Sequence, residues 1–420
     1  MSKAVYGMKR LVRKGKYSQA AIRLLKGLSR RVDALIVHAC WMFPVNDRRI
    51  VFQSDIDYWD NTRTFSDFLV SQGLDSFYDI VWMVDKPEAY HPKGELKFVK
   101  KWTLLPNPRS DFIIATAKLA MFTHGVPAGI YQRRPYPQQT YMLTTHSASQ
   151  LKRSFDRITR KRYDFILCCG RDAYEKRFDA WDLREGQLPI LGMPRLDLMY
   201  RHRDCLSILY PERSGKRLVL AMETFKKSER YDDSSVTESY GLNVIRGEDE
   251  LESLDALLGS KGAVLVIKTH HMQDMSYLRR LELTNVLFLT DEEMQARGVQ
   301  LNEFLENADL LLTDYSSVYY DFLLVDRPIG FMVADIDEYT RGFASDDPLS
   351  EMPGAIIEDA ESLMEFIGSS LAGKDGFSKE RARVRDLVFA RQGPGNCRRL
   401  LEWLQSNGLL PTPEVTDYVE

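Results

Sequence analysis

The segment ADLLLTDYSSVYYD, residues 308–321, reads as a buried strand that runs through a polar turn into a helix. Backbone N–H groups are free at the start of a helix, and here they would lie beside the hydroxyls of Ser316 and Ser317. Such a site can hold an anion, and a diphosphate suits it. Asp and Ser are also good helix caps, so a purely structural turn is the alternative.

A second polar cluster follows the apolar run VLVIK in the segment VLVIKTHH, residues 264–271. Lys268 and His270 are two residues apart, so they share a face if the strand continues. A cation and an imidazole there could neutralise charge on a leaving phosphate. The alternatives are ordinary surface histidines, or metal ligation by His270 and His271, for which no nearby carboxylate completes a ligand set.

Two histidines of the first half also follow strand-like runs. His124 comes after LAMFT and His146 comes after YMLTT. Because histidine titrates near neutral pH, either could be the general base that takes a proton from an acceptor hydroxyl. A polar residue that simply satisfies its own hydrogen bonds after a strand is the plainer interpretation of each.

Two further segments carry cations that could contact a phosphate. The turn GMPR, residues 192–195, presents Arg195, and the segment ETFKKSER, residues 223–230, holds Lys226. A solvated charged loop is the alternative for both. The sequence contains no Walker loop, GxGxxG, GxSxG or HExxH motif.

The elements that must position these side chains are strands alternating with helices from residue 48 onward, a pattern typical of parallel βαβ units. The strands predicted in the first half are 50–54, 80–84, 119–123, 141–144 and 165–169, and those in the second half are 218–222, 263–268, 286–289, 310–313 and 329–333. Ligands of such sheets bind beyond the carboxyl ends of the strands, where the polar clusters fall.

The pattern predicts an α/β protein with four parts. Residues 1–44 form basic amphipathic helices, 45–205 a first Rossmann-like domain, 206–390 a second Rossmann-like domain, and 391–420 a C-terminal helix and tail. Residues 200–216, which are polar and contain Pro211 and Gly215, are the predicted linker. Two such domains in series leave a cleft between them.

The first 31 residues contain ten Lys or Arg residues and no Asp or Glu. An apolar stripe follows at helical spacing: Leu24, Leu25, Leu28, Val32, Leu35 and Ile36. A basic helix with one apolar stripe can lie in the headgroup region of an anionic leaflet, so we expect contact with an anionic membrane surface. A surface helix packed on the body of the protein is the alternative.

Composition narrows the class of protein. The chain has 420 residues and a formal net charge of only −3, which does not favour a nucleic-acid partner. Its five cysteines include no CxxC pair, so disulfides and zinc fingers are not expected, which fits the cytoplasm. No stretch reaches the ~18–20 apolar residues of a membrane span, and the early sequence lacks the pattern of a secretory signal.

Taken in order, these segments resemble the CDP-glycerol glycerophosphotransferase family, the enzymes of teichoic-acid and related capsule synthesis. The resemblance covers residues 44–404. Its motifs are IVFQSDIDYWDNTRTFSDFL with Asn61, GMPRLD with Arg195 and Asp197, ETFKK with Lys226, KTHH with His270, TDYSS at residues 313–317 and DRPI at residues 326–329.

One segment departs from the family pattern. The first catalytic histidine of the family lies in Trp-His-Gly-Thr-Pro-Leu-Lys, and the matching stretch here is THSASQLK, residues 145–152. His146 and Lys152 remain, whereas the Trp, Gly and Pro are absent, so the difference bears on the acceptor side. His124, in Thr-His-Gly, is the competing candidate for the base.

The resemblance implies a GT-B-like architecture of two Rossmann-like, doubly wound domains facing a cleft, with residues 45–205 as the acceptor domain and 206–390 as the CDP-donor domain. It implies that His146 and His270 are catalytic. It points to no metal ligands and to no cofactor, and the donor substrate is CDP-glycerol or CDP-ribitol. The implied contacts to the donor diphosphate or CDP are Lys268, Thr313, Asp314, Ser316, Ser317, Arg195 and Lys226, with His124, Asn61 and Asp321 as further candidates.

The implied reaction moves glycerol phosphate or ribitol phosphate to a hydroxyl of a lipid-linked or polymeric acceptor and releases CMP. Such an enzyme would be peripheral, at the cytoplasmic face of the cell membrane. Two alternatives of other classes remain: a GT-B glycosyltransferase that uses a nucleotide sugar in cell-surface polysaccharide synthesis, and a non-catalytic membrane scaffold that keeps the fold.

Overall fold

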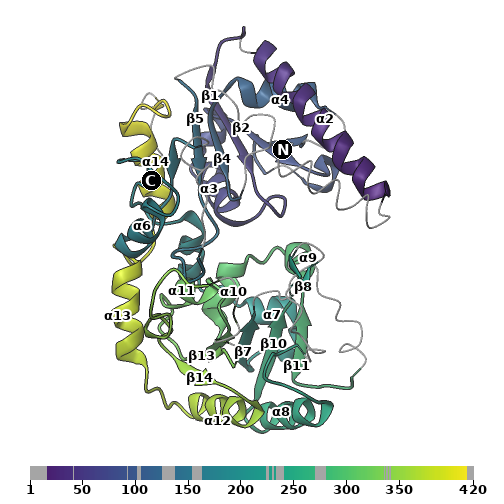
Figure 1. Cartoon of the computed structure of the whole chain (residues 1–420), viewed down its shortest axis with the longest axis vertical. Coiled ribbons are helices and arrows are strands. Elements are labelled where there is room, and N and C mark those ends of the chain that lie inside the picture. The colour runs from purple at the N-terminus through teal and green to yellow at the C-terminus, as the bar shows by residue number, and fades with distance from the viewer. Residues whose placement is uncertain are drawn as a thin grey trace.

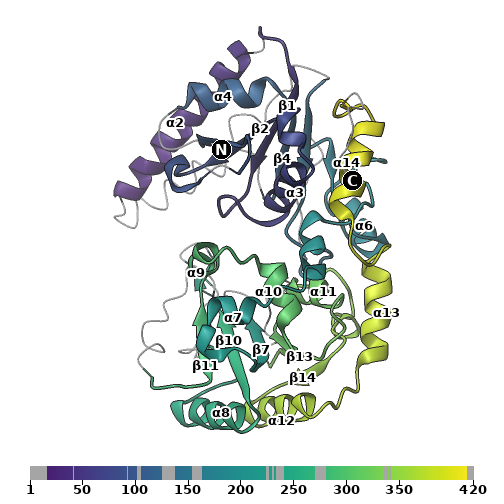
Figure 2. The same ribbon diagram turned by 180° about the vertical axis from the view of Figure 1, so that it is seen from behind.

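The computed structural model describes residues 17–40, 42–91, 93–101, 106–124, 138–153, 163–223, 227–228, 231–232, 241–269, 281–334, 336, 339 and 342–413. Two parallel sheets lie in separate halves, which face each other in Figures 1 and 2.

The first sheet has six strands in the order β3-β2-β1-β4-β5-β6, all paired in parallel. They are β1 (Asn46–Gln53), β2 (Asp79–Val84), β3 (Lys97–Lys100), β4 (Ala117–Phe122), β5 (Thr140–Leu143) and β6 (Phe165–Ile166). The helices of this half are α2 (Tyr17–Cys40), α3 (Asp60–Ser71), α4 (Pro108–Ala115) and α6 (Arg171–Phe178), with short 3-10 turns η1 (Leu74–Ser76) and η2 (Pro87–Ala89).

Successive residues of β1 pack into different cores, as the two-residue period of a strand requires. Val51 lies among residues of α2, α4 and α6, while Ile50 and Phe52 lie among residues of α3 and α14 (Asn396–Ser406). Helices therefore cover both faces of the first sheet, which explains why Ile50, Val51 and Phe52 of β1 are all apolar and buried.

The second sheet also has six parallel strands, in the order β11-β10-β7-β12-β13-β14. They are β7 (Arg217–Met222), β10 (Ala263–Lys268), β11 (Val286–Leu289), β12 (Leu310–Thr313), β13 (Ile329–Met332) and β14 (Ala355–Ile357); β8 (Lys227–Ser228) and β9 (Tyr231–Asp232) form a separate antiparallel pair. Its helices are α7 (Cys205–Leu209), α8 (Glu248–Ser260), α9 (Asp291–Ala296), α10 (Leu301–Asn307), α11 (Val318–Phe322), α12 (Ala360–Leu371) and α13 (Ser378–Val388).

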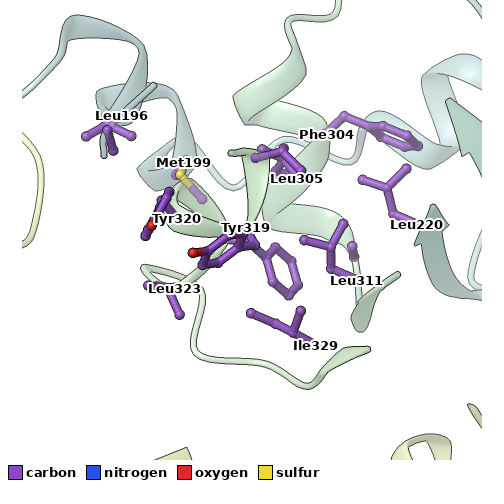
Figure 3. Packing of buried hydrophobic residues seen from close by; sticks show 14 of the residues in the cluster. Leu196, Met199, Leu220, Phe304, Leu305, Leu311, Tyr319, Tyr320, Leu323 and Ile329 are labelled. Carbon is purple, nitrogen blue, oxygen red and sulfur yellow. The ribbon is translucent and has the colours of Figure 1, made fainter. Parts of the chain in front are cut away.

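The largest core links the second sheet to η3 (Pro194–Tyr200), a 3-10 segment between the two halves. Figure 3 shows Leu196 and Met199 of η3 close to Tyr319 and Tyr320 of α11, above Ile329 of β13. Further short 3-10 turns are η4 (Pro211–Arg213) and η7 (Leu349–Glu351). The element that carries Arg195 is thus packed against the helix that follows the TDYSS segment.

The chain crosses between the halves more than once. After the second sheet, α13 runs back along the side of the molecule and α14 packs on the first sheet, as Figures 1 and 2 show. Asp197 of η3 holds the start of α14 by accepting the backbone N–H groups of Asn396 and Cys397 at 2.8 and 2.9 Å. Lys152 also forms an isolated antiparallel bridge with Phe343.

The predicted α/β fold with two doubly wound sheets is confirmed, and all ten predicted strands are present within a few residues of their expected bounds. The short edge strands β3 and β14 and the helices α6 and α12 were not predicted. The four domain boundaries stay a prediction, although the return of α14 to the first sheet shows that sequence order alone does not assign each element to a half.

Helix α2 packs in an unexpected way. The side buried against the body is formed by Ser29, Asp33, Val37 and Cys40. Five members of the predicted apolar stripe are exposed instead: Leu24, Leu25, Leu28, Val32 and Leu35. Helix α2 therefore does pack on the body of the protein, as the alternative expected, but most of the predicted apolar stripe stays outside this contact. Among the described residues, no helix combines the length and the apolar character needed to cross a bilayer.

Candidate active site

The carboxyl ends of both sheets open onto one cleft of about 290 Å³, a volume suited to a small ligand. The first half contributes Trp59, His124 and His146 to its wall, and the second half contributes Lys268, Asp291, Ser316 and Ser317. The structure therefore brings together seven predicted candidates from five segments of the sequence: His124, His146, Arg195, Lys268, Ser316, Ser317 and Asp321.

The serine turn, residues 314–317, connects β12 to α11. Its conformation is stabilised by the carboxylate of Asp314, whose Oδ1 accepts the backbone N–H of Ser316 at 2.9 Å. Both serines line the cleft. Their hydroxyls are therefore available to an anionic ligand on the side of the second sheet.

Thr313 and Asp314 were predicted to contact the donor, and the structure corrects this. Both are fully buried, and neither lines the cleft. The hydroxyl of Thr313 donates to the carbonyl of Met222 on the neighbouring strand at 2.7 Å. These residues support the serine turn from beneath, because a strand end in a packed sheet must satisfy its polar groups internally.

Lys268 ends β10, which β7 separates from β12 in the sheet, and it lines the same wall of the cleft as the serine turn. Its ammonium group is 2.8 Å from Oδ1 of Asp291, which begins α9, and the two side chains are only 9% and 10% exposed. A ligand phosphate that approaches Lys268 must therefore compete with a carboxylate already in place. Asp291 was not predicted as a site residue.

His146 and His124 face the cleft from the first sheet and stack on each other, with ring centroids 4.5 Å apart and an interplanar angle of 4°. The hydroxyl of Thr123 lies 3.0 Å from Nδ1 of His124. The two candidate bases, 22 residues apart in sequence, thus lie side by side in the structure. A single acceptor hydroxyl could reach either imidazole.

The His146 side chain is exposed to the cleft, and protein groups of the cleft walls surround it there. Desolvation, followed by repulsion from His124, Arg195, Arg177 and Lys152, lowers the pKa of His146 to about 3. The ring is therefore neutral at physiological pH and has a lone pair free to accept a proton.

The base loop, residues 144–147, presents His146 in a constrained conformation. Thr145 has a φ of 53°, in the left-handed region that a β-branched residue rarely adopts. Two buried side chains hold the loop from either side of His146. Asn61 donates from Nδ2 to the carbonyl of Thr145 at 2.8 Å, and Arg177 donates from Nη2 to the carbonyl of Ser147 at 2.8 Å.

Arg195 lines the base of the cleft and is almost fully buried. Its Nε lies 2.7 Å from Oδ2 of Asp321 in α11, its Nη2 lies 3.1 Å from Oδ1 of the same carboxylate, and its Nη1 lies 3.3 Å from Oδ1 of Asp60. Burial alone would lower the pKa of this guanidinium, but the carboxylates of Asp321 and Asp60 outweigh it and raise that pKa above its usual range.

Residues 35–405 match the family described as CDP-Glycerol:Poly(glycerophosphate) glycerophosphotransferase. The chain belongs to this family. The match extends over both sheets and the cleft between them, so the predicted family, and with it the prediction of a phosphotransferase that uses a CDP-linked alcohol, is confirmed.

Relatives of known activity agree with the family. The teichoic acid poly(glycerol phosphate) polymerase of Bacillus spizizenii is 24% identical over 370 residues, which cover 80% of this chain and 87% of the relative. The teichoic acid ribitol-phosphate primase of the same species is 28% identical over 218 residues, covering 49% of this chain and about half, 51%, of the relative. Both glycerol and ribitol enzymes are therefore among the relatives.

The fold also resembles that of a solved teichoic acid polymerase. The structure of the wall teichoic acid polymerase TagF superimposes with a TM-score of 0.68 over 97% of each chain, at 19% sequence identity. At this identity the likeness shows the architecture alone. It confirms the predicted GT-B-like arrangement of two doubly wound domains in this glycerophosphotransferase family member.

Two predicted site residues, His270 and Lys226, lie outside the described residues, as does most of the ETFKKSER segment. The catalytic role of His270 and the donor contact of Lys226 stay predictions. Asn61 is fully buried behind the base loop rather than in the cleft wall, and Asp321 faces both the cleft and Arg195.

Several cleft residues of this family member were missed by sequence reasoning. Asp291 and Asn302 line the wall from the second half, and Asp55, Trp59 and Asp60 line it from the first. The sequence held a signal for two of them. Asp291 comes two residues after a predicted strand, and Asp55 directly follows another, so both stand at the carboxyl ends where ligands are expected.

Proposed function

We propose that this protein transfers glycerol phosphate or ribitol phosphate from a CDP-alcohol to a hydroxyl of a lipid-linked or polymeric acceptor, in the synthesis of a teichoic-acid-like or capsular polymer. The observation that carries the proposal is the facing pair of cleft walls. One wall offers the neutral imidazole of His146, and the other offers two hydroxyls and the ammonium group of Lys268.

The donor diphosphate would lie against Ser316, Ser317 and Lys268. The acceptor hydroxyl would lie beside His146, which takes its proton as the oxygen attacks the β-phosphorus. The bond between the β-phosphorus and the bridging oxygen then breaks, CMP leaves with that oxygen, and a new phosphodiester joins the alcohol to the acceptor. Phosphoryl transfer mainly requires that the attacking oxygen and the phosphorus are held in position and that the phosphate charge is compensated, and these groups supply both.

Binding of the donor would raise the pKa of His146, the proposed base. Without the donor, desolvation and the repulsion from nearby cationic groups lower the pKa of His146, and a neutral imidazole of so low a pKa is a weak base. A diphosphate opposite the ring adds negative charge, which raises the pKa of a neighbouring imidazole. Donor binding therefore makes His146 a better proton acceptor at the moment when an acceptor hydroxyl needs one.

We also propose that α2 holds the enzyme on the cytoplasmic face of the membrane as a peripheral protein. Its exposed apolar residues include Leu28 and Leu35, the latter 70% exposed, and Met42 and Phe43 continue the apolar surface just beyond the helix. Ten basic residues precede or accompany this surface within the first 31 positions. Apolar insertion combined with attraction to anionic lipid is the usual basis of such binding.

The experiment that tests the reaction measures CMP release from CDP-glycerol, CDP-ribitol and a panel of UDP-sugars, each with a teichoic-acid acceptor. CMP release from one of the CDP-alcohols, together with a phosphodiester product, is expected. Transfer of a sugar from a UDP-sugar, with no CMP release, would contradict the proposal and favour a glycosyltransferase. Absence of turnover with every donor and acceptor would favour the scaffold.

A further inference from the structure

A buried network of hydrogen bonds and ion pairs runs beneath the cleft from one wall to the other. It begins at the carbonyl of Thr145, next to His146, and passes to Asn61 through a hydrogen bond of 2.8 Å. Oδ1 of Asn61 then accepts the backbone N–H of Arg195 at 3.1 Å. Asn61 is fully buried, so both of its hydrogen bonds are protected from water.

The network continues through the side chain of Arg195 to the carboxylate of Asp321. Two guanidinium nitrogens contact the two oxygens of this carboxylate, and Asn302 also donates to its Oδ2 at 3.0 Å. Asp321 stands four residues after Ser317, and residues at this spacing lie on one side of a helix. Whatever fixes Asp321 therefore fixes the orientation of the serine turn.

The charges in this network argue against Arg195 as a donor ligand. Its single positive charge is already shared by the carboxylates of Asp321 and Asp60. The three groups together carry a net charge of about −1, which would repel rather than attract a diphosphate. By contrast, the planar two-point contact between guanidinium and carboxylate is well suited to holding two elements in a defined geometry.

We propose that Asn61, Arg195 and Asp321 are positioning residues that set the spacing between the base loop and the serine turn. One face of the network holds the loop that presents His146, and the other holds the helix that follows Ser317. The inference rests on the proposed function, because the spacing matters only if a proton acceptor and a diphosphate site work together. It predicts that the network affects turnover and leaves donor affinity almost unchanged.

The test uses the full-length protein and the nearly isosteric variants Asn61→Asp and Asp321→Asn, with Arg195→Lys as a third. Donor affinity is measured by calorimetric titration with CDP-glycerol, and kcat is measured by CMP release. We expect each variant to lose at least tenfold in kcat while its Kd for CDP-glycerol stays within about threefold of the wild type, because misalignment slows the chemical step more than it weakens binding.

Gln295→Ala is the matched control. Gln295 also joins the two halves, through a hydrogen bond of 3.1 Å from its Nε2 to the carbonyl of Asp57, but it does not belong to the network or line the cleft. This variant should keep its kcat within about twofold. The double variant Asn61→Asp with Asp321→Asn should lose no more kcat than the more impaired of the two single variants, since the effects of residues that act as a unit do not add.

Three results would overturn the inference. A tenfold or greater rise in Kd for Arg195→Lys with unchanged kcat would make Arg195 a donor ligand. A wild-type kcat in Asn61→Asp or Asp321→Asn would show that the residue does not position the site. A fold-loss of kcat in the double variant equal to the product of the two single fold-losses would show that the residues do not act as a unit. If Asp321→Asn does not fold, Asn61→Asp decides the question alone. Failure of the proposed function is seen separately, as a wild-type protein that releases no CMP from either CDP-alcohol.

Discussion

The pair formed by Lys268 and Asp291 leads to a prediction in which stability and affinity move in opposite directions. Asp291→Asn removes the charge that faces the ammonium group and changes the side-chain volume very little. Removing one member of a buried pair costs about 3–5 kcal/mol. Because this pair borders an open cleft, water can partly compensate, and we expect the free energy of unfolding to fall by about 2 kcal/mol.

A loss of that size lowers the melting temperature by about 4–8 °C for a domain of some 150–250 residues. The control is Glu175→Gln, which removes an exposed pair in which Nε of Arg171 lies 2.6 Å from Oε1 of Glu175 and the two side chains are 84% and 59% exposed. Water screens such an exposed pair and its side chains lose freedom on pairing, so the control should melt close to the wild type.

The same substitution should strengthen donor binding. In the wild type the diphosphate competes with Asp291 for Lys268, and Asp291→Asn ends that competition. We expect a Kd for CDP-glycerol about tenfold lower, equivalent to about 1.4 kcal/mol. At a fixed excess of donor, CDP-glycerol should therefore raise the melting temperature of the variant by more than it raises that of the wild type. Weaker or unchanged donor binding would refute the assignment of Lys268 as a donor ligand.

Three further outcomes are expected. His146→Ala should lower kcat by about 10²–10⁴-fold without lowering the melting temperature. His124→Ala should lower kcat by less. CMP release measures kcat for both variants, and thermal melts measure their stability. The pKa of His146 is lowered on folding to about 3, from about 6.5 in the unfolded chain, so the folded protein takes up the proton less readily. Relative to His146→Gln, the donor-free wild type should therefore lose stability as the pH falls from about 6.5 toward 3. A difference in melting temperature between the two proteins that does not change with pH would contradict the lowered pKa of this imidazole. The double variant Leu28→Glu and Leu35→Glu should abolish sedimentation with vesicles of anionic phospholipid and leave the melting temperature unchanged, while Leu387→Glu, at a position 52% exposed on α13, should leave vesicle binding intact.

The sheets and most of the site could be predicted because their signals are local. Apolar runs of four to six residues located β10, β11 and β12 at their observed bounds. The rule that ligands bind beyond the carboxyl ends of parallel strands then selected Lys268 and the serine turn. The edge strand β14 has only three residues, of which one is buried, and so short a run gives little periodic signal.

What could not be predicted depends on contacts between distant segments. Helical periodicity identified the apolar stripe of α2 but could not show that the opposite side packs on the body. That side is held by Asp33, whose Oδ1 accepts the backbone N–H of Asn107 at 3.1 Å. The partners of Arg195 lie 126 and 135 residues away, so only the folded chain shows that its charge is already shared.

The donor-bound structure tests the central claim most directly. Crystals of the His146→Ala variant soaked with CDP-glycerol should retain the intact donor, because the proposed base is missing. The account predicts that the diphosphate contacts Ser316, Ser317 and Lys268, with the β-phosphorus turned toward the empty space left by the imidazole. A diphosphate bound elsewhere, or a β-phosphorus facing away from the base loop, would contradict it.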